Sequence, residues 1–230
     1  MNNLLLRFKN HNRLNLTLIL ISSAALSVFL VAFRIYYSGH ITYAFLVWNL
    51  LLAFIPFIIS SAALLYMERI KSKLLLLTII FSWLLFFPNA PYIVTDFFHL
   101  SNRGDVPLWY DMGLLISFSW NGLMLGFISL YDIQHIINDF LGKLYGWAFA
   151  IVSIILGSFG IYLGRFQRWN SWDIIANPFG LAADIAGRLL NPFAHPRTML
   201  VTLLFSIFLI FGYLTLVQLI NIKRSALRND

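Results

Sequence analysis

Long apolar runs alternate with short polar connections along almost the whole chain. A helix that crosses about 30 Å of hydrocarbon needs about 20 residues, and six runs reach that length. The predicted spans cover about residues 14–37, 44–67, 74–95, 112–131, 144–163 and 198–222. The pattern therefore predicts an all-α membrane protein, a six-transmembrane-helix bundle in which residues 1–230 form a single domain.

The first apolar run resembles a signal peptide, because Arg7, Lys9 and Arg13 precede it. The run is longer than the apolar core of a signal, and its small residues at 22–25 lie in its middle instead of behind it. We therefore predict a first transmembrane helix that is retained in the protein.

Composition agrees with this class, since 60% of the residues are hydrophobic and only 11% are charged. Soluble domains carry about 25% charged residues. The absence of cysteine excludes disulfides, thiolate metal sites and cysteine nucleophiles. The net charge of +7 comes from basic residues that flank the apolar runs, which indicates membrane lipids and not nucleic acid as partners.

Lysine and arginine counts predict the orientation, because short cytoplasmic segments are enriched in them. With the N-terminus inside, the inner segments hold ten of the 16 basic residues and the outer segments hold six. The inner set is Arg7, Lys9, Arg13, Arg69, Lys71, Lys73, Lys143, Lys223, Arg224 and Arg228. The outer set is Arg34, Arg103, Arg165, Arg168, Arg188 and Arg197. We predict a multi-pass protein of the cytoplasmic membrane with both termini in the cytoplasm.

Two connections are much longer than the others, at residues 96–111 and 164–197. Both fall on the predicted outer side, and the second holds four of the six outer arginines. Arginines in an outer loop oppose the usual charge bias, so we expect them to serve structure or function. We therefore predict that any site lies on the outer face.

The first motif is FFPNAPYIVTDFFHL at residues 86–100. Pro88 and Pro91 lack a backbone donor and clash with the preceding turn, so the third helix is predicted to end or break there. Broken helices within a membrane are buried in protein or line a polar site. Asn89 and Tyr92 are therefore candidate ligand-binding residues, and a plain helix end with a turn is the alternative.

The connection that follows carries candidates for acid–base chemistry. Asp96 and His99 are three residues apart and share a face if the helix resumes. Asp96 would orient His99 as a general base, or both would bind a metal, and Asp111 is a third catalytic candidate. The alternatives are a solvated interfacial pair and, for Asp111, a cap on the fourth helix beside the belt aromatics Trp109 and Tyr110.

Asn121 lies within the fourth predicted span, between Trp120 and Gly122. An Asn in the middle of a membrane normally forms a hydrogen bond with another helix. Asn121 is thus a ligand-binding candidate whose alternative is a structural hydrogen bond.

The densest polar motif is GIYLGRFQRWNSWD at residues 160–173. Arg165 and Arg168 lie three residues apart at the end of the fifth span, and a guanidinium is a planar donor fork for phosphate or carboxylate. We take Arg165, Arg168, Asn170 and Asp173 as candidate ligand-binding residues. The alternative is a set of snorkelling arginines in an aromatic belt.

The remainder of that connection contains two Asn-Pro-Phe segments, at 177–179 and 191–193. Asn as a cap followed by Pro at the first helical position favours a helix start. We predict a short helix between the two segments that lies in the outer interface or dips into the membrane as a re-entrant segment.

No nucleotide-binding, zinc-protease or serine-hydrolase motif occurs in the chain. The five histidines, at 11, 40, 99, 135 and 195, are scattered, so a metal site would need long-range assembly. We predict neither a metal nor a cofactor.

Three segments carry a resemblance to a known family: FFPNAPYIVTDFFHL, PLWYD at 107–111 and GIYLGRFQRWNSWD. They are similar to the bacterial integral membrane family called domain of unknown function 1361, and the likeness extends from about the second span to the sixth. The resemblance implies a polytopic membrane protein without an established activity, and it therefore supplies no catalytic residues.

Three functional hypotheses follow. The leading one is a protein that binds or translocates an anionic amphiphile, a lipid or a cell-wall intermediate, at an outer polar site where all the candidate residues converge. The second is an intramembrane hydrolase or transferase that acts on a lipid-linked substrate through Asp96 and His99. The third is a membrane assembly or stability factor whose polar network only holds the helices together.

Overall fold

The structure is a computed structural model that describes residues 13–67, 70, 72–102 and 106–229, with side chains to residue 222. Within these ranges every regular element is a helix, and six segments are long and apolar enough to cross a membrane. These are residues 13–38, 45–65, 73–99, 108–141, 143–166 and 196–222. Arg7, Lys9, Arg69, Lys71 and Arg103, which entered the orientation prediction, lie outside the described residues, as do the side chains of Lys223, Arg224 and Arg228.

The chain divides into two compact units, residues 1–132 and 133–230, and the division falls inside one long helix. The first unit contains α2 (Arg13–Ser38), α3 (Phe45–Leu65), α4 (Lys73–Phe86), α5 (Asn89–Tyr92), η2 (Ile93–His99) and most of α6 (Leu108–Leu141). The second contains the end of α6, α7 (Lys143–Phe166), α8 (Asp173–Ala176), α9 (Pro178–Leu190), η3 (Pro192–Ala194) and α10 (Pro196–Asn229).

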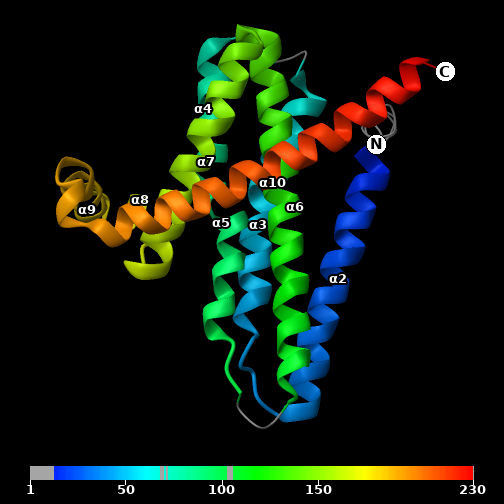
Figure 1. Cartoon of the computed structure of the whole chain (residues 1–230), viewed down its shortest axis with the longest axis vertical. Coiled ribbons are helices and arrows are strands. Elements are labelled where there is room, and N and C mark those ends of the chain that lie inside the picture. Colours follow the sequence, from blue (N-terminus) through cyan, green and yellow to red (C-terminus); the bar gives the residue numbers. More distant parts are fainter. Residues whose placement is uncertain (1–12, 68–69, 71, 103–105, 230) are drawn as a thin grey trace. The chain divides into compact units, whose positions relative to one another are not determined.

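In the first unit, α2, α3 and α6 run side by side (Figure 1). Apolar residues that recur every three or four positions line the facing sides of these helices. The buried core comprises Leu20, Val31, Leu46, Leu50, Phe57, Ile93, Leu115, Phe118 and Leu125, among others. Large apolar side chains on the outer sides of the same helices are exposed, as expected where lipid is the solvent.

The break in the third span is confirmed. The α-helix α4 ends at Phe86, directly before Pro88, and the chain continues as the short α5 and then as the 3₁₀-helix η2. Pro88 and Pro91 cannot donate to the preceding turn, which explains why the regular helix stops there. Both α5 and η2 pack against α3.

A small-residue pair on α6 receives the broken segment. A Cβ atom added to Gly122 would lie 2.4 Å from the backbone oxygen of Ala90, and one added to Gly126 would lie 3.2 Å from the Ala90 Cβ. Gly122 and Gly126 form a GxxxG pattern, which lets helix backbones approach closely in membranes. The backbone of α5 therefore packs directly on α6.

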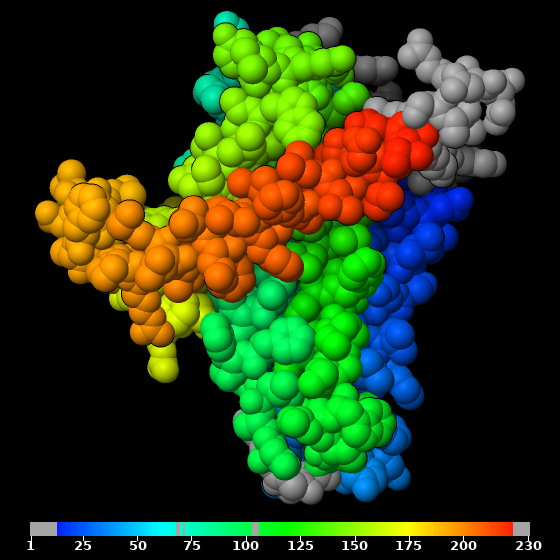
Figure 2. Space-filling view, in the orientation of Figure 1, coloured from blue at the N-terminus to red at the C-terminus, as the bar shows by residue number. Residues whose placement is uncertain are grey.

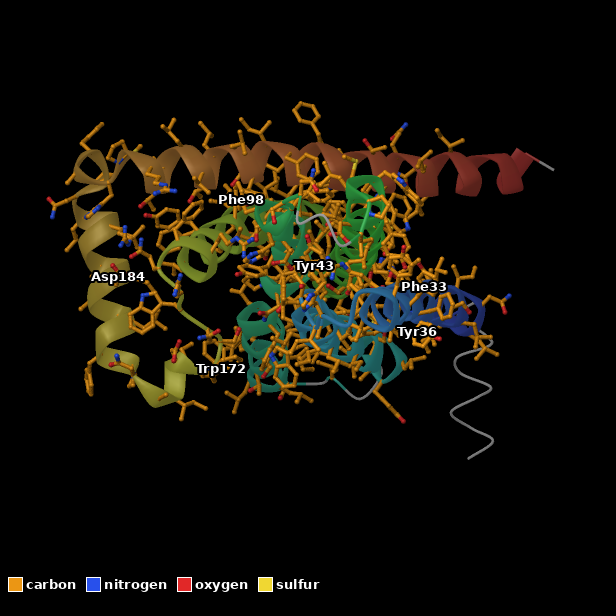
Figure 3. The ribbon with its side chains drawn as sticks, turned by 90° about the horizontal axis from the view of Figure 1, so that it is seen from below. Phe33, Tyr36, Tyr43, Phe98, Trp172 and Asp184 are labelled. Atoms are coloured by element: carbon orange, nitrogen blue, oxygen red, sulfur yellow. The ribbon has the colours of Figure 1, made fainter. Side chains whose placement is uncertain are left out.

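In the second unit, α7 and α10 pack against each other, and the α8–α9 segment connects them. The predicted short helix is confirmed as α9, which Asn177 caps by accepting a hydrogen bond from the Gly180 amide at 3.1 Å. Figure 3 shows α9 turning away from the direction of α10, and Figure 2 shows it protruding beside the start of α10. The fourth helix is longer than predicted, because α6 continues to Leu141 and only Gly142 separates it from α7.

Candidate functional site

Two buried arginines of α2 form ion pairs with two buried aspartates of α6. Arg34 donates from Nε to one Asp111 oxygen at 2.7 Å and from Nη2 to the other at 3.1 Å. Arg13 pairs with Asp132 through a single bond, from Nη2 to one carboxylate oxygen. All four side chains are at most 7% exposed. The planar fork of arginine suits such pairing, and each partner would be costly to bury alone.

The spacing of these pairs matches the thickness of a bilayer. Arg13 and Arg34 are 21 positions apart on α2, and Asp111 and Asp132 are 21 positions apart on α6. Because the helices are antiparallel, one pair lies at each end of the seam between them. Twenty-one residues rise about 30 Å, which is about the thickness of the hydrocarbon layer. In a helix that crosses the membrane, this spacing would place the charges where the apolar layer ends.

The pair at the Arg13 end also includes two hydroxyls from α3. Ser61 accepts a hydrogen bond from Arg13 at 3.1 Å, and Ser60 donates to Asp132 at 3.0 Å. The Arg13 guanidinium lies 5.4 Å from the centre of the Phe57 ring. This network joins α2, α3 and α6.

At the opposite end, Arg34 lies over the ring of Tyr43, 4.8 Å from its centre, and the Tyr43 hydroxyl donates to the His99 carbonyl at 3.2 Å. The cap that was the alternative role of Asp111 is wrong, because α6 begins at Leu108 and the Asp111 carboxylate binds Arg34. Exposed aromatics surround this end, as expected at a membrane–water interface; Phe33, Tyr36 and Phe98 are labelled in Figure 3.

The acid–base candidates Asp96 and His99 have different environments. Asp96 is 1% exposed and accepts a hydrogen bond from the Asn49 amide of α3 at 2.9 Å. His99 is exposed, and its ring packs edge-on against Phe45 at 5.0 Å between centroids. Within the described residues, no group of three acidic or histidine side chains is arranged to hold a metal ion.

The other candidates of the first unit, Asn89, Tyr92 and Asn121, lie at a helix end or between helices. Asn89 donates to the Phe86 carbonyl at 3.0 Å, where it closes the end of α4, and Tyr92 ends α5. Asn121 donates to Ser27 of α2 at 3.1 Å, about 15 Å along α6 from Asp111. The Asn121 amide oxygen is buried without a hydrogen-bond partner among the described residues. Asn121 therefore bridges α2 and α6 at a level distinct from Asp111.

The second unit has its own polar cluster, centred on Arg188 of α9. Its guanidinium donates to Asp184 at 3.0 Å, to the Tyr162 hydroxyl of α7 at 3.1 Å and to Thr198 of α10 at 3.2 Å. The Trp169 indole donates to the second Asp184 oxygen at 2.9 Å. These bonds fasten α9 to the end of α7 and the start of α10, with Asp184 on the inward side of α9 (Figure 3).

Partial burial raises the pKa of Asp184, but hydrogen bonds from Arg188 and Trp169, together with the charges of Arg188 and His195, outweigh it. The net result is a pKa below the usual value for an aspartate. Asp184 is therefore a carboxylate that the fold holds in its charged form.

The predicted ligand residues of this unit border that cluster. Arg165 is half-buried in the last turn of α7, and Arg168 is exposed, with a φ of 62°. Asn170 and Asp173 bind each other, since the backbone N–H of Asn170 donates to the Asp173 carboxylate at 2.6 Å. That bond closes the turn before α8.

Sequence reasoning missed several members of both networks. Arg188 and Asp184 are four residues apart, which is a recognisable helical ion-pair spacing. Arg197 lies over the Phe166 ring at 4.3 Å, and Phe166 stacks on Tyr162. The other members that were missed are Arg13, Arg34, Asn49, Ser60, Ser61, Asp132, Tyr162 and Thr198.

A family model described as protein of unknown function (DUF1361) matches residues 48–212, which is most of the chain. The match spans α3 to the middle of α10 and includes the candidate residues of both units. No curated protein and no solved structure matches the chain.

Proposed function

Because the chain belongs to the family described as protein of unknown function (DUF1361), which names no activity, we propose a function from its own side chains. We propose that it binds a phosphate- or carboxylate-bearing amphiphile at the arginines of the α7–α10 connection. The anionic group would meet Arg165 and Arg168, and the apolar tail would lie along α9. Asn170 and Asp173 would shape the loop beside it.

The conformation of Arg168 is the observation that carries the proposal. It is the one described non-glycine residue with a positive φ, a conformation that costs a side-chain-bearing residue about 1–2 kcal/mol. Arg168 follows the last residues of α7, where the Trp169 amide donates to the Leu163 carbonyl at 3.1 Å, and glycine is the usual residue at such a helix end. An arginine there is exposed, so its guanidinium is accessible to a ligand. The cost of this conformation in a residue other than glycine supports a functional role for the side chain.

The balance of charge supports the same conclusion. The connection at 164–197 holds four arginines against two aspartates, and Asp184 is already neutralised by Arg188. The surplus positive charge lies beside Phe166, over which Arg197 is stacked. A cationic and aromatic surface at a membrane boundary suits a phosphate group.

The outward side of α9 supports an amphiphilic ligand. Phe179, Leu190 and the nearby Phe193 are 88%, 78% and 89% exposed, while Asp184 and Arg188 face inward. Thirteen residues make a helix of about 20 Å, too short to cross the membrane. We propose that α9 lies in the interface with its apolar side in lipid.

The outer location of this site rests on the orientation prediction. Arg13 and Arg34 are buried in ion pairs, so they no longer count as loop charges. The remaining balance is nine inner to five outer basic residues, which still favours cytoplasmic termini. The site would then face the exterior of the cytoplasmic membrane.

The test compares the lipid dependence of unfolding between the wild-type protein and Arg168→Gly. In neutral detergent, phosphatidylglycerol should raise the wild-type free energy of unfolding by about 2.7 kcal/mol at about 100 times Kd. Phosphatidylcholine with the same acyl chains should raise it little. Arg168→Gly should lose most of the phosphatidylglycerol increment while keeping or raising the lipid-free Tm.

Lys143→Ala is the matched control, because it removes one exposed positive charge from the other end of α7. It should keep the wild-type response to phosphatidylglycerol. Equal increments in the wild type and Arg168→Gly would refute the proposal.

A purely structural role is the second candidate, and it is supported in the first unit, where the candidate Asp111 and three other charged side chains are buried in ion pairs. The enzyme alternative has less support, because Asp96 is 1% exposed and bonded to Asn49. His99 remains exposed at the same end. If His99→Ala abolished turnover of a lipid-linked substrate without changing Tm, the enzyme hypothesis would replace ours.

A further inference from the structure

One face of α10 carries polar residues into the apolar span. Thr198, Thr202, Ser206 and Tyr213 follow one another at helical spacing, and this is the side of α10 that is most buried. Thr198 binds Arg188, and Tyr213 packs against Trp147 of α7 at 6.3 Å between ring centroids. The polar face therefore lies toward α7.

The register of the two helices places α7 hydroxyls beside this face. Arg188 joins Tyr162 to Thr198, and Trp147 meets Tyr213, so contacts 15 residues apart on α7 are matched by contacts 15 residues apart on α10. Counting four residues from Tyr162 and Thr198 along each helix brings Ser158 level with Thr202. Ser158 is fully buried and its hydroxyl is bonded to the Ile154 carbonyl.

Two hydroxyls of the polar face lack partners. The Thr202 and Ser206 oxygens are buried without a hydrogen-bond partner among the described residues, and Ser206 is only 5% exposed. A buried hydroxyl that is left unpaired costs about 1–3 kcal/mol. Residues four apart on a helix have Cβ atoms about 5–6 Å apart, a separation that one water molecule bridges. A water molecule between the two hydroxyls would therefore remove the cost of leaving them unpaired.

We propose that the α7–α10 interface binds ordered water between Thr202 and Ser206, which extends the polar network of Arg188 into the membrane span. Water bonded to both hydroxyls supplies the partners that the protein atoms lack, as buried water does in other folds. At one end of this row of polar side chains, Thr198 binds Arg188. At the other end, beyond Ser206, lies the buried hydrogen bond between Tyr213 and Gln134. The ligand of this site is water, so the inference stands apart from the anionic amphiphile.

The chain contains no cysteine, so single-cysteine variants report water without background. A thiol must ionise to react with a methanethiosulfonate, and ionisation requires water. In proteoliposomes, Ser206→Cys and Thr202→Cys should react with aminoethyl methanethiosulfonate at least about tenfold faster than Leu209→Cys. Leu209 is the matched control, since it lies on the same helix and is 1% exposed. Equal rates at 206 and 209 would overturn the proposal.

A second variant keeps the inference testable if a cysteine disturbs the fold. A dry, unpaired hydroxyl destabilises the native state, so Ser206→Ala would raise Tm if the interface held no water. With water bound, removal of the hydroxyl leaves Tm unchanged or lowers it. A raised Tm for Ser206→Ala would overturn the proposal, whereas an unchanged or lowered Tm with fast modification at 206 supports it. Neither readout measures binding of an anionic lipid, so these experiments test the water site independently of the proposed amphiphile site.

Discussion

Arginine has two different environments in the two units. In the first unit, Arg13 and Arg34 bond to aspartates 119 and 77 positions away, and all four side chains are buried. In the α7–α10 connection, Arg188 bonds to a neighbour four positions away, and Arg168 is exposed in a strained conformation. Buried pairs at both ends of a helix seam fix where the helices lie. The exposed arginines of the second unit are instead the basis of the anionic-ligand site that we propose.

The largest expected effect comes from breaking a seam pair. Asp111→Asn removes the carboxylate that binds the buried Arg34 guanidinium, so the free energy of unfolding should fall by about 3–5 kcal/mol. Asp173→Asn in the second unit, where the carboxylate is partly exposed, should change it by about 1 kcal/mol or less. Reversible unfolding in mixed micelles measures both.

The double variant Arg34→Met with Asp111→Leu separates charge from packing. Replacing both partners by apolar side chains removes the unpaired charge, so most of the loss should be recovered. If Asp111→Asn and Asp173→Asn cost the same, the contrast between the two units would be wrong.

A smaller effect is expected where α5 meets α6. A methyl group at Gly122 would lie 2.4 Å from the Ala90 oxygen, which is backbone and cannot move aside easily. Gly122→Ala should therefore cost about 1–3 kcal/mol. Gly187→Ala in α9, where nothing lies within 4 Å, should stabilise by up to about 1 kcal/mol through helix propensity.

Opposite signs for the two substitutions would show that the broken span is tightly packed and the face of α9 is open. Gly113→Ala, also with nothing within 4 Å, controls for alanine in α6 itself. A loss at Gly113 as large as at Gly122 would assign the effect to the helix and not to the contact.

The pH dependence of the Arg188 cluster should be smaller again. Because the pKa of Asp184 is lowered by folding, its contribution is present above the unfolded pKa of about 3.9 and is lost as pH falls through the folded pKa. Asp184→Asn should cost about 1–2 kcal/mol near neutral pH, and the gap to wild type should close as the pH falls below about 4. Tm measured against pH follows this gap. A gap that widens toward acid pH would contradict the assigned cause.

Local signals predicted much of this molecule. Apolar length located six spans, Pro88 and Pro91 located the break, and Asn177 with Pro178 located the start of α9. Each of these features is set by neighbours in the sequence, through backbone chemistry that the residue type dictates. The spacing of Asp184 and Arg188 and the GxxxG pattern at Gly122 carried readable signals of the same kind.

The seam pairs could not be predicted in the same way. The two charged residues are 21 positions apart on both α2 and α6. Each of the six spans can have several neighbours, and the sequence alone does not say which helix lies beside which. The sequence therefore offered Asp111 as a catalytic candidate or a helix cap, and the structure instead places Arg34 beside it. For the same reason, the charge count that predicts the orientation treats Arg13 and Arg34 as loop residues, although both are bound to aspartates of α6. Whether the candidates of both units form one site stays a prediction.

The smallest effect tests whether local bonds alone set the α9 segment. Asn177 accepts a hydrogen bond from the Gly180 amide, whereas Asn191, which also precedes a proline, makes no side-chain cap bond. Asn177→Ala should cost about 1 kcal/mol and Asn191→Ala less than about 0.5 kcal/mol. Loss of the cap should also speed hydrogen exchange at the Gly180 amide and leave the first unit unchanged. Equal costs at the two positions would mean that lipid or the Arg188 bonds hold α9 in place. The α9 segment would then differ less from the first unit, where long-range ion pairs hold the helices.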